Sequence, residues 1–136
     1  MSERMYLIMN IGLKGHAETV VDKTNTAATI GSGNLEVFAT PHMIALMECA
    51  SLSSVAPELE EGMSTVGTHL DVSHDAATPL GMKVWADSEL VEIDGRRLVF
   101  DVKAYDECGL IGQGKHERFI VKSEKFLAKV NAKANK

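Results

Sequence analysis

One segment that is apolar around most of a helical circumference limits the folds open to this chain. Residues 41–56 read PHMIALMECASLSSVA and are expected to form a helix. Thr40 is a favoured N-cap residue, Pro41 suits the first helical position, and Pro57 is expected to end the helix. A helix with so little polar surface must be buried, so the rest of the chain has to surround it.

The segments on either side of this helix have the patterns of β-strands. Several alternate apolar and polar residues with period two, and Asp94-Gly95 is a strong signal for a hairpin between two of them. Gly112 and Gly114 share one face of the last strand and leave room for a bulky neighbour. We expect strands over residues 5–11, 17–22, 65–74, 83–93, 97–105 and 110–122, and a short amphipathic helix over about 123–134.

Strands that follow one another through tight turns indicate an antiparallel sheet. A sheet wrapped around one long central helix is the hot-dog architecture, an α+β fold, here with a short C-terminal helix. We expect a single domain over residues 1–136, with an N-terminal strand or extension at 1–12 and the C-terminal helix and tail at 123–136. Such a sheet still needs cover on its remaining face and edge, so we expect a homodimer.

The composition excludes several classes of function. The formal net charge of −5 argues against general binding to nucleic acid or to an anionic membrane, and no apolar run could span a bilayer. The N-terminus lacks the pattern of a secretory signal, and Cys49 and Cys108 lack metal-ligand spacing. Both cysteines are expected to be free thiols in a reducing cytoplasm. The chain contains no P-loop, dinucleotide-binding glycine motif, G-x-S-x-G or C-x-x-C.

Glu48 is the one acidic residue within the apolar helix. Its helical neighbours are apolar or uncharged, so no local cation can pair with it: Ile44, Ala45, Ser51 and Leu52. A buried carboxylate without a partner is costly. Glu48 therefore either lies on a wet edge of the helix, or is a structural acid bound by backbone N–H groups, or serves as a nucleophile or general base.

Thr40 and His74 are the other candidates for catalysis. Alternation places His74 at the end of one face of its strand, next to a loop; the other expected members of that face are Val66, Thr68, Leu70 and Val72. An imidazole there is either a core histidine or a group for proton transfer. Thr40 caps the helix in either case, and a helix N-terminus also favours developing negative charge.

The remaining charged candidates are weaker. His69, Asp71 and His116 have the residue types of a metal site, but their spacing does not close a ligand set. Arg118 is expected on the same face as His116, where it forms a structural ion pair with Glu48 or Asp71 or meets a substrate phosphate. We expect no metal and no cofactor.

Four separated motifs together carry a family resemblance, over about residues 13–130. They are VFATPHMIALMECAS, VGTHLDVSHDAATPLG, DGRRLVF and GKHERFIVKSEKF, in this order and spacing. In these motifs the chain resembles the hot-dog thioesterases related to fluoroacetyl-CoA thioesterase. The resemblance implies hydrolysis of a small acyl-CoA thioester to free acid and CoA, with CoA present only as part of the substrate.

The resemblance also implies roles for individual residues. It places the catalytic group on Thr40, Glu48 and His74, and a backbone N–H for the thioester carbonyl on Gly67. It assigns Arg118, through the HER motif, to the substrate site. Eight helical residues rise about 12 Å, so Thr40 and Glu48 of one chain cannot touch across a regular helix. Either the first turn of the helix is irregular, or the site combines residues from two subunits, and we expect a site at the dimer interface.

One departure concerns the acyl group. Asn34 stands six residues before Thr40, where the fluoroacetyl-specific enzyme carries a phenylalanine-bearing lid; Phe38 is retained. Fluoroacetyl selectivity is therefore not expected, although Phe38 and Asn34 remain candidates for contact with substrate. Two other functions fit the same fold, namely a non-catalytic acyl-CoA-binding module and a hydratase or dehydratase. Glu48 discriminates, because a binding module needs no carboxylate beside a thioester.

Overall fold

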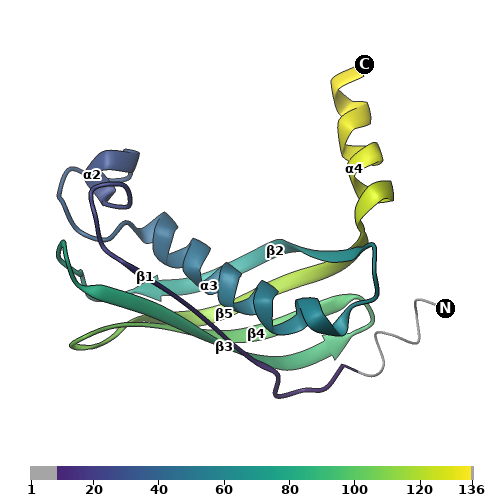
Figure 1. Ribbon diagram of the computed structural model, residues 1–136, viewed down its shortest axis with the longest axis horizontal. Helices are drawn as coiled ribbons and strands as arrows, with labels where there is room; N and C mark the ends of the chain where they lie inside the picture. The colour runs from purple at the N-terminus through teal and green to yellow at the C-terminus, as the bar shows by residue number, and fades with distance from the viewer. Residues whose placement is uncertain (1–8, 136) are drawn as a thin grey trace.

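The computed structural model of the protein describes residues 9–135 and is built from five strands and one long helix (Figure 1). The strands are β1 (Lys14–Val20), β2 (Met63–His74), β3 (Lys83–Asp94), β4 (Arg97–Asp106) and β5 (Gly109–Lys122). The helices are α2 (Ala27–Ile30), α3 (Thr40–Val55) and α4 (Ser123–Asn131). Short 3₁₀ turns, η1 (Ala56–Glu58) and η2 (Ala132–Asn135), follow α3 and α4.

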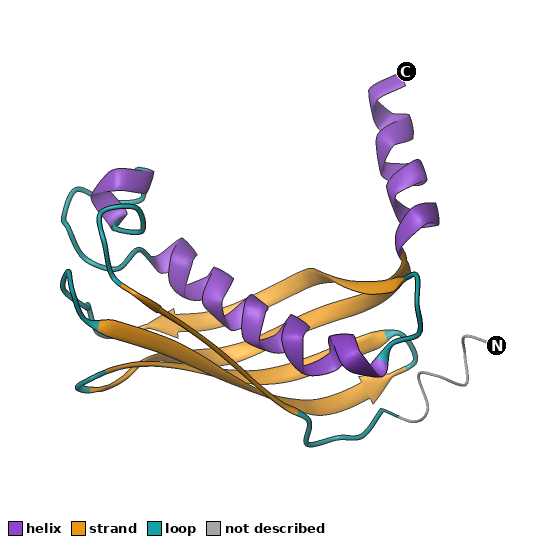
Figure 2. Ribbon diagram, in the orientation of Figure 1, coloured by secondary structure: helices purple, strands orange, loops and turns teal. Residues whose placement is uncertain are grey.

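The strands form one antiparallel sheet in the order β1-β3-β4-β5-β2, and the sheet curls around α3 (Figure 2). This confirms the hot-dog fold. The hairpin expected at Asp94-Gly95 joins β3 to β4, and Gly95 has a φ of 62°, which suits glycine. β1 and β2 are the two edges of the sheet, so each turns one row of backbone hydrogen-bonding groups away from it.

The core lies between the concave face of the sheet and one side of α3. The helix contributes Met43, Met47, Ala50 and Val55. Alternate residues of β4 face them and are at most 1% exposed, as their period-two pattern predicted: Leu98, Phe100, Val102 and Ala104. The other side of α3 remains exposed at Ala45, Cys49 and Leu52, so the expected full burial of the helix is wrong. A single sheet layer covers only one side of a helix.

Two glycines allow the helix to approach the sheet closely. A Cβ atom added to Gly15 of β1 would lie 1.9 Å from the carbonyl oxygen of Ala50 in α3. One added to Gly112 of β5 would lie 2.7 Å from the sulfur of Met43. The expectation that missing side chains in β5 admit a bulky neighbour is therefore confirmed at Gly112, where Met43 of α3 approaches; a Cβ on Gly114 would instead lie 2.1 Å from the Asp71 carbonyl oxygen of β2.

The N-terminal strands differ from expectation. The segment predicted at residues 5–11 lies partly outside the described residues, and the described part, 9–11, is not a strand. Gly12 has a φ of 100° in a turn, and β1 begins only at Lys14, ending at Val20 rather than at residue 22. Apolar content alone predicted the first segment, whereas pairing with β3 decides where the strand lies. The loop after β1 does contain the short helix α2.

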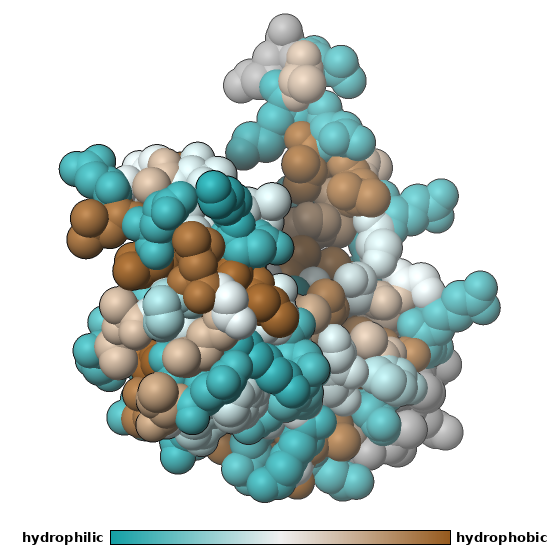
Figure 3. All heavy atoms as spheres, turned by 60° about the vertical axis from the view of Figure 1, so that its left-hand side comes forward, coloured by the Kyte–Doolittle hydropathy of each residue, from teal (hydrophilic) through white to brown (hydrophobic). Residues whose placement is uncertain are grey.

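The C-terminal helix α4 projects away from the sheet, and both hydrophobic and hydrophilic surface is visible on it (Figure 3). Its start is held by a hydrogen bond from the Ser123 N–H to the Gly62 carbonyl, 2.9 Å long. Leu127 and Val130 are exposed. Among the described residues, no helix is long and apolar enough to cross a membrane. Cys49 and Cys108 are both free and exposed, as expected.

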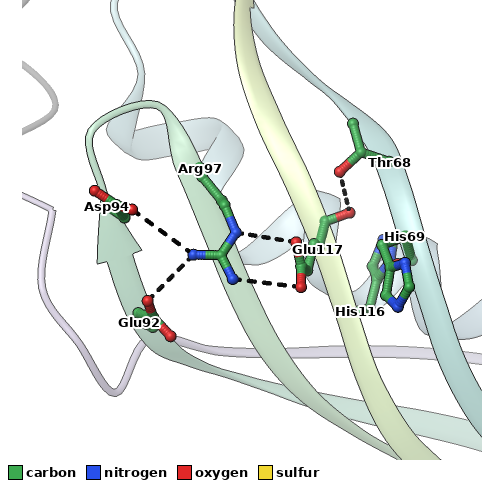
Figure 4. Close-up of polar contacts among 7 residues, drawn as sticks. All are labelled: Thr68, His69, Glu92, Asp94, Arg97, His116 and Glu117. Atoms are coloured by element: carbon green, nitrogen blue, oxygen red, sulfur yellow. Dashed lines mark hydrogen bonds and ion pairs between the residues drawn. The ribbon is translucent and has the colours of Figure 1, made fainter.

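On the convex face, Arg97 ties three strands together (Figure 4). Its Nε donates to a Glu117 oxygen of β5 at 3.0 Å, and its Nη1 donates to Glu92 of β3 at 3.2 Å. The hydrogen bond from Arg97 holds the pKa of Glu117 below its usual value. These exposed pairs contribute little stability but orient neighbouring strands.

A β-bulge in β2 changes which of its residues face inward. Gly67 pairs with Arg118, but His69 already pairs with Glu117, so Thr68 is the extra residue. The Thr68 hydroxyl donates to the Glu117 carbonyl at 3.2 Å. The expected single face is therefore wrong for Val66: before the bulge Gly67 faces inward, and after it the inward residues are Leu70, Val72 and His74.

We expect Gly15→Ala to lower the free energy of unfolding by about 2–3 kcal/mol, because the added methyl meets the backbone of α3 and not a movable side chain. Urea unfolding followed by circular dichroism measures the change. Gly33→Ala is the matched control, since its Cβ would lie 3.2 Å from the Ala27 side chain at an ordinary φ. Equal stability of the two variants would contradict the close approach of β1 and α3.

Candidate active site

The first functional group joins the start of α3 to the end of β2. The Thr40 hydroxyl lies 2.7 Å from Nδ1 of His74. The expectation that Thr40 is the N-cap is wrong: Ala39 occupies that position, and its carbonyl accepts from the His42 and Met43 N–H groups. Because the helix begins one residue early, the Thr40 side chain is free to turn toward β2.

His74 is placed to accept a hydrogen bond from the Thr40 hydroxyl. Burial lowers the pKa of His74 below its ordinary value of 6.5, so the ring is neutral at physiological pH. A neutral ring whose Nδ1 accepts from the Thr40 hydroxyl carries its own hydrogen on Nε2. Nε2 is buried and has no partner of good hydrogen-bond geometry among the described residues, while the nearby backbone of Ala76 partly opposes the lowering of the His74 pKa.

The second group surrounds Glu48, halfway along α3. The Glu48 side chain is 37% exposed, so this residue lies on the wet edge of the helix and is not a fully buried acid. Its Oε2 lies 3.8 Å from Nη1 of Arg118 and 4.0 Å from Nε2 of His116. Of the two carboxylates expected as partners of Arg118, the structure therefore places Glu48 beside it.

Arg118 is held in place by three further contacts. Its Nε donates to the Thr65 hydroxyl at 2.8 Å, and its Nη2 donates to the Thr65 carbonyl at 3.0 Å. Its Nη1 lies 3.1 Å from Nε2 of His116. Burial lowers the pKa of Arg118, and the nearby Glu48 charge opposes that shift. The guanidinium stays charged and presents a fixed positive edge to Glu48.

His116 is the buried link in this group. It is 0% exposed, and its Nδ1 lies 2.9 Å from the carbonyl of His69, directly after the bulge. That carbonyl can only accept, so Nδ1 carries the hydrogen and Nε2 accepts from Arg118. Burial is the largest cause of a lowered pKa at His116, and the Arg118 charge adds to it. A neutral His116 therefore fixes the orientation of Arg118.

Gly67 lies directly against the Glu48 carboxylate. A Cβ atom on Gly67 would be 2.6 Å from Glu48 Oε2 and 3.2 Å from the His116 ring. Any larger residue at this position would displace the carboxylate. Glu48, Gly67 and Arg118, three of the residues singled out from the sequence, thus form one cluster.

The two groups are separate within one chain. Thr40 and Glu48 lie eight residues apart in a continuous helix, which corresponds to about 12 Å of rise. The irregular first turn that could have shortened this distance is absent, because α3 runs unbroken from Thr40 to Val55. The described chain by itself does not bring Thr40 and His74 to Glu48.

A cavity of about 250 Å³ opens beside the first group. Thr40, His74 and Phe38 line it, together with residues of the α2 region and of the loop after β2. Phe38 is 1% exposed, so it is also part of the core. Asn34 is exposed in the loop before α3 and is not among the lining residues.

The candidate metal residues do not assemble. His69 and Asp71 pair with Glu117 and Lys115 and are exposed, whereas His116 is buried on the opposite face. In residues 9–135, no group of three or more histidine, cysteine or acidic side chains is placed to hold a metal ion. The sequence missed Thr65 because its contact with Arg118 depends on the pairing of β2 with β5. It missed the setting of His116 because the bulge at Thr68 places the His69 carbonyl against that ring, and no local pattern indicates the bulge.

Comparison with known proteins places this geometry in context. The family model described as fluoroacetyl-CoA-specific thioesterase matches residues 21–124. The fluoroacetyl-CoA thioesterase of Streptantibioticus cattleyicolor is 48% identical over 98 residues, which cover 72% of this chain and 70% of that protein.

Solved structures agree with this match. The fluoroacetyl-CoA thioesterase FlK superimposes with a TM-score of 0.86 at 40% identity, over 92% of this chain and 97% of that chain. A variant of FlK in complex with fluoroacetate and CoA gives a TM-score of 0.82 at 39% identity, over 87% and 99% of the two chains. A Thermus thermophilus protein described as a thioesterase superfamily member is 31% identical, with a TM-score of 0.85 over 93% of each chain.

Replacement of His116 tests the anchoring of Arg118. We expect His116→Phe to cost about 2–3 kcal/mol in the free energy of unfolding, because it leaves the His69 carbonyl and an Arg118 N–H buried without partners. Denaturant unfolding measures the loss. His69→Phe makes the same chemical change at an exposed position and should be nearly neutral; a comparable loss there would contradict the assignment.

Proposed function

Because the chain belongs to the fluoroacetyl-CoA-specific thioesterase family, we propose that it hydrolyses a small acyl-CoA thioester to the free acid and CoA. The observation that carries the site assignment is the half-exposed Glu48 carboxylate, held between the Gly67 backbone and the Arg118 guanidinium. A carboxylate kept accessible beside a fixed cation is suited to attack or to proton abstraction.

Glu48 is assigned to the bond-making step. As a nucleophile it attacks the thioester carbonyl carbon, the C–S bond breaks, and an acyl-enzyme anhydride and CoA thiolate result. Water then hydrolyses the anhydride to the free acid and regenerates the carboxylate. As a general base, Glu48 instead takes a proton from a water molecule that attacks the same carbon. The Gly67 N–H stabilises the negative charge that develops on the carbonyl oxygen in either route.

Thr40 and His74 are assigned to the departing group. The neutral His74 ring, with its hydrogen on Nε2, can donate a hydrogen bond to the departing sulfur of CoA, and the thiolate then takes its proton from water. The Thr40 hydroxyl then gives its hydrogen bond to Nδ1 and keeps the ring in this tautomer. Phe38 bounds the neighbouring cavity, which has room for a small acyl group.

We assign the complete site to two subunits of a homodimer. One chain separates the Thr40–His74 pair from Glu48 by about 12 Å of helix, so a second copy has to supply one of the groups. β2 is the surface that we assign to the contact between the two subunits. It is a 12-residue edge strand, and residues 67–71 are exposed along it. A long, uncovered edge strand favours pairing with another copy.

The register of β2 is compatible with this arrangement. Gly67 and His74 face the same side of the sheet because of the bulge at Thr68. An antiparallel contact centred near Leu70, which is exposed, brings the partner's His74 to within two residues of Gly67 on the same face. Glu48 of one subunit would then meet the Thr40–His74 pair of the other.

The proposal also covers the acyl group, which we expect to be small, the absence of a cofactor, and a location in the cytoplasm. Asn34 leaves the loop before Phe38 without the aromatic lid of the fluoroacetyl-specific enzyme, so we assign a small acyl group other than an exclusively fluorinated one. The proposed steps use protein side chains and water, so no cofactor is required. Two free, exposed cysteines fit a reducing cytoplasm.

Glu48→Gln tests the chemical step. We expect thiol release from acyl-CoA to fall by at least about a hundredfold, because the amide can neither attack nor accept a proton. Release of CoA across a panel of short and branched acyl groups, followed with a thiol reagent, gives the rate and the preferred acyl chain. Unchanged circular dichroism and oligomeric state would show that the fold is retained. Normal turnover by the variant would refute the assignment of Glu48.

Mixing of inactive variants tests the shared site. Glu48→Gln and His74→Ala subunits, unfolded together in equal amounts and refolded, should regain about a quarter of the wild-type rate. Half of the dimers are then mixed, and each mixed dimer has one intact site out of two. Refolding of each variant alone is the control. A mixture that stays as inactive as its components would place each site within a single subunit.

A further inference from the structure

The C-terminal end of the chain concentrates positive charge in an otherwise acidic protein. The formal net charge of the whole chain is −5, yet residues 122–136 contain five lysines and a single acidic residue, Glu124. Three of the lysines, Lys122, Lys125 and Lys129, lie at the end of β5 and on α4 and line one hollow. This cluster plays no part in the chemistry proposed above.

These lysines differ from most other basic residues of the fold in having no carboxylate partner. On the sheet, Lys14, Lys83, Arg97, Lys115 and Arg118 each form an ion pair. Lys122, Lys125, Lys129 and Lys133 form none with any described residue. Of the other lysines, Lys23 and Lys103 are also unpaired within residues 9–135 but lie apart from one another. Clustered, unneutralised lysines create a local positive potential that attracts anions.

The positive charge lines a hollow between α4 and the β3–β4 hairpin. The hollow has a volume of about 210 Å³, and Arg96 and the half-buried ring of Phe126 complete its lining. The hairpin is fixed against β5 there, because the Ile120 N–H donates to the Arg96 carbonyl at 2.9 Å. A concave site with cations and one aromatic ring fits a phosphorylated nucleoside better than a bare inorganic ion.

The hollow also lies at a suitable distance from Glu48. Arg118, which touches Glu48, and Lys122, which lines the hollow, are four residues apart on the same strand, about 13 Å of extended chain. In an acyl-CoA, the pantetheine arm separates the thioester from the diphosphate and the 3′-phosphate by a comparable stretch of chain. One substrate molecule can therefore reach both places.

We propose that Lys122, Lys125 and Lys129, with Arg96 and Phe126, bind the phosphorylated adenosine end of the CoA substrate. The inference rests on the proposed thioesterase function and deepens it, since it names the part of the substrate that these residues hold. The lysines neutralise phosphate charge, and Phe126 offers a face to the adenine ring. An acidic protein thereby obtains a local attraction for a polyanionic substrate.

An anionic membrane is the other partner that a basic, amphipathic helix can suit, and Leu127 and Val130 are exposed on α4. The nucleotide is favoured because the lysines line a concavity and do not flank a flat apolar face. α4 is also only nine residues long, which leaves little apolar area for insertion. Vesicle binding is therefore included as an outcome of the test.

The test is the double charge reversal Lys125→Glu/Lys129→Glu in the full-length protein. Both residues are exposed, so the melting temperature should not change. Lys125→Arg/Lys129→Arg keeps the charge and should behave like the wild type. Lys103→Glu is the matched control, since Lys103 is an unpaired, exposed lysine on the convex face of β4.

Two substrates separate nucleotide binding from chemistry. With acyl-CoA, we expect the double reversal to raise KM about tenfold or more with little change in kcat, because ground-state and transition-state binding weaken equally. With the same acyl group on N-acetylcysteamine, which lacks the nucleotide, all variants should have the wild-type rate. Salt should raise the wild-type KM for acyl-CoA and have little effect on that of the double reversal.

The outcomes keep the two proposals apart. An unchanged KM for acyl-CoA in the double reversal, with normal turnover, overturns the lysine site and leaves the thioesterase function standing. If the wild type releases no thiol from either substrate, calorimetry with adenosine 3′,5′-bisphosphate still decides, because the lysine site requires binding that the double reversal loses. Binding of phosphatidylserine vesicles without any binding of the bisphosphate would assign the lysines to a membrane surface and overturn the proposal.

Discussion

The packing of one side of α3 against a curled sheet is the constraint on which the rest of the structure depends. The inward side chains of the helix fill the concave face, and glycines at Gly15 and Gly112 let the backbones approach. The same packing fixes the height and rotation of every other residue of the helix. The packing therefore holds the Glu48 side chain at the border between core and solvent.

The surroundings of Glu48 show how the sheet accommodates a charge there. Gly67 leaves space for the carboxylate, and Arg118 supplies the opposite charge. Arg118 in turn depends on Thr65 and on a neutral His116, whose second nitrogen is bound to the backbone at the bulge. A buried arginine with all of these contacts is pre-organised, so its interaction with Glu48 requires no rearrangement.

The bulge at Thr68 has consequences beyond its own hydrogen bonds. Without it, Gly67 and His74 would face opposite sides of β2, because seven residues separate them and strand faces alternate. With it, both face the concave side, as the proposed site shared between two subunits requires. A one-residue irregularity thus decides which side chains of the edge strand β2 face the same side of the sheet. Lys122, at the base of α4, lies on the same strand as Arg118, so β5 connects both ends of the proposed substrate site.

The sequence by itself determined the architecture. The apolar helix, the hairpin at Asp94-Gly95 and the period-two strands are local patterns, and they were sufficient for a sheet wrapped around one helix. Thr40, Glu48 and His74 were also identifiable, the first and last by position and motif and Glu48 by its unusual setting. Tertiary structure alone decided the start of β1, the true N-cap at Ala39, the choice of Glu48 over Asp71 as the partner of Arg118, and the contacts of His116. These depend on which backbone groups pair across the sheet and on the bulge that shifts the pairing, and such long-range pairing leaves no periodic signal in the chain.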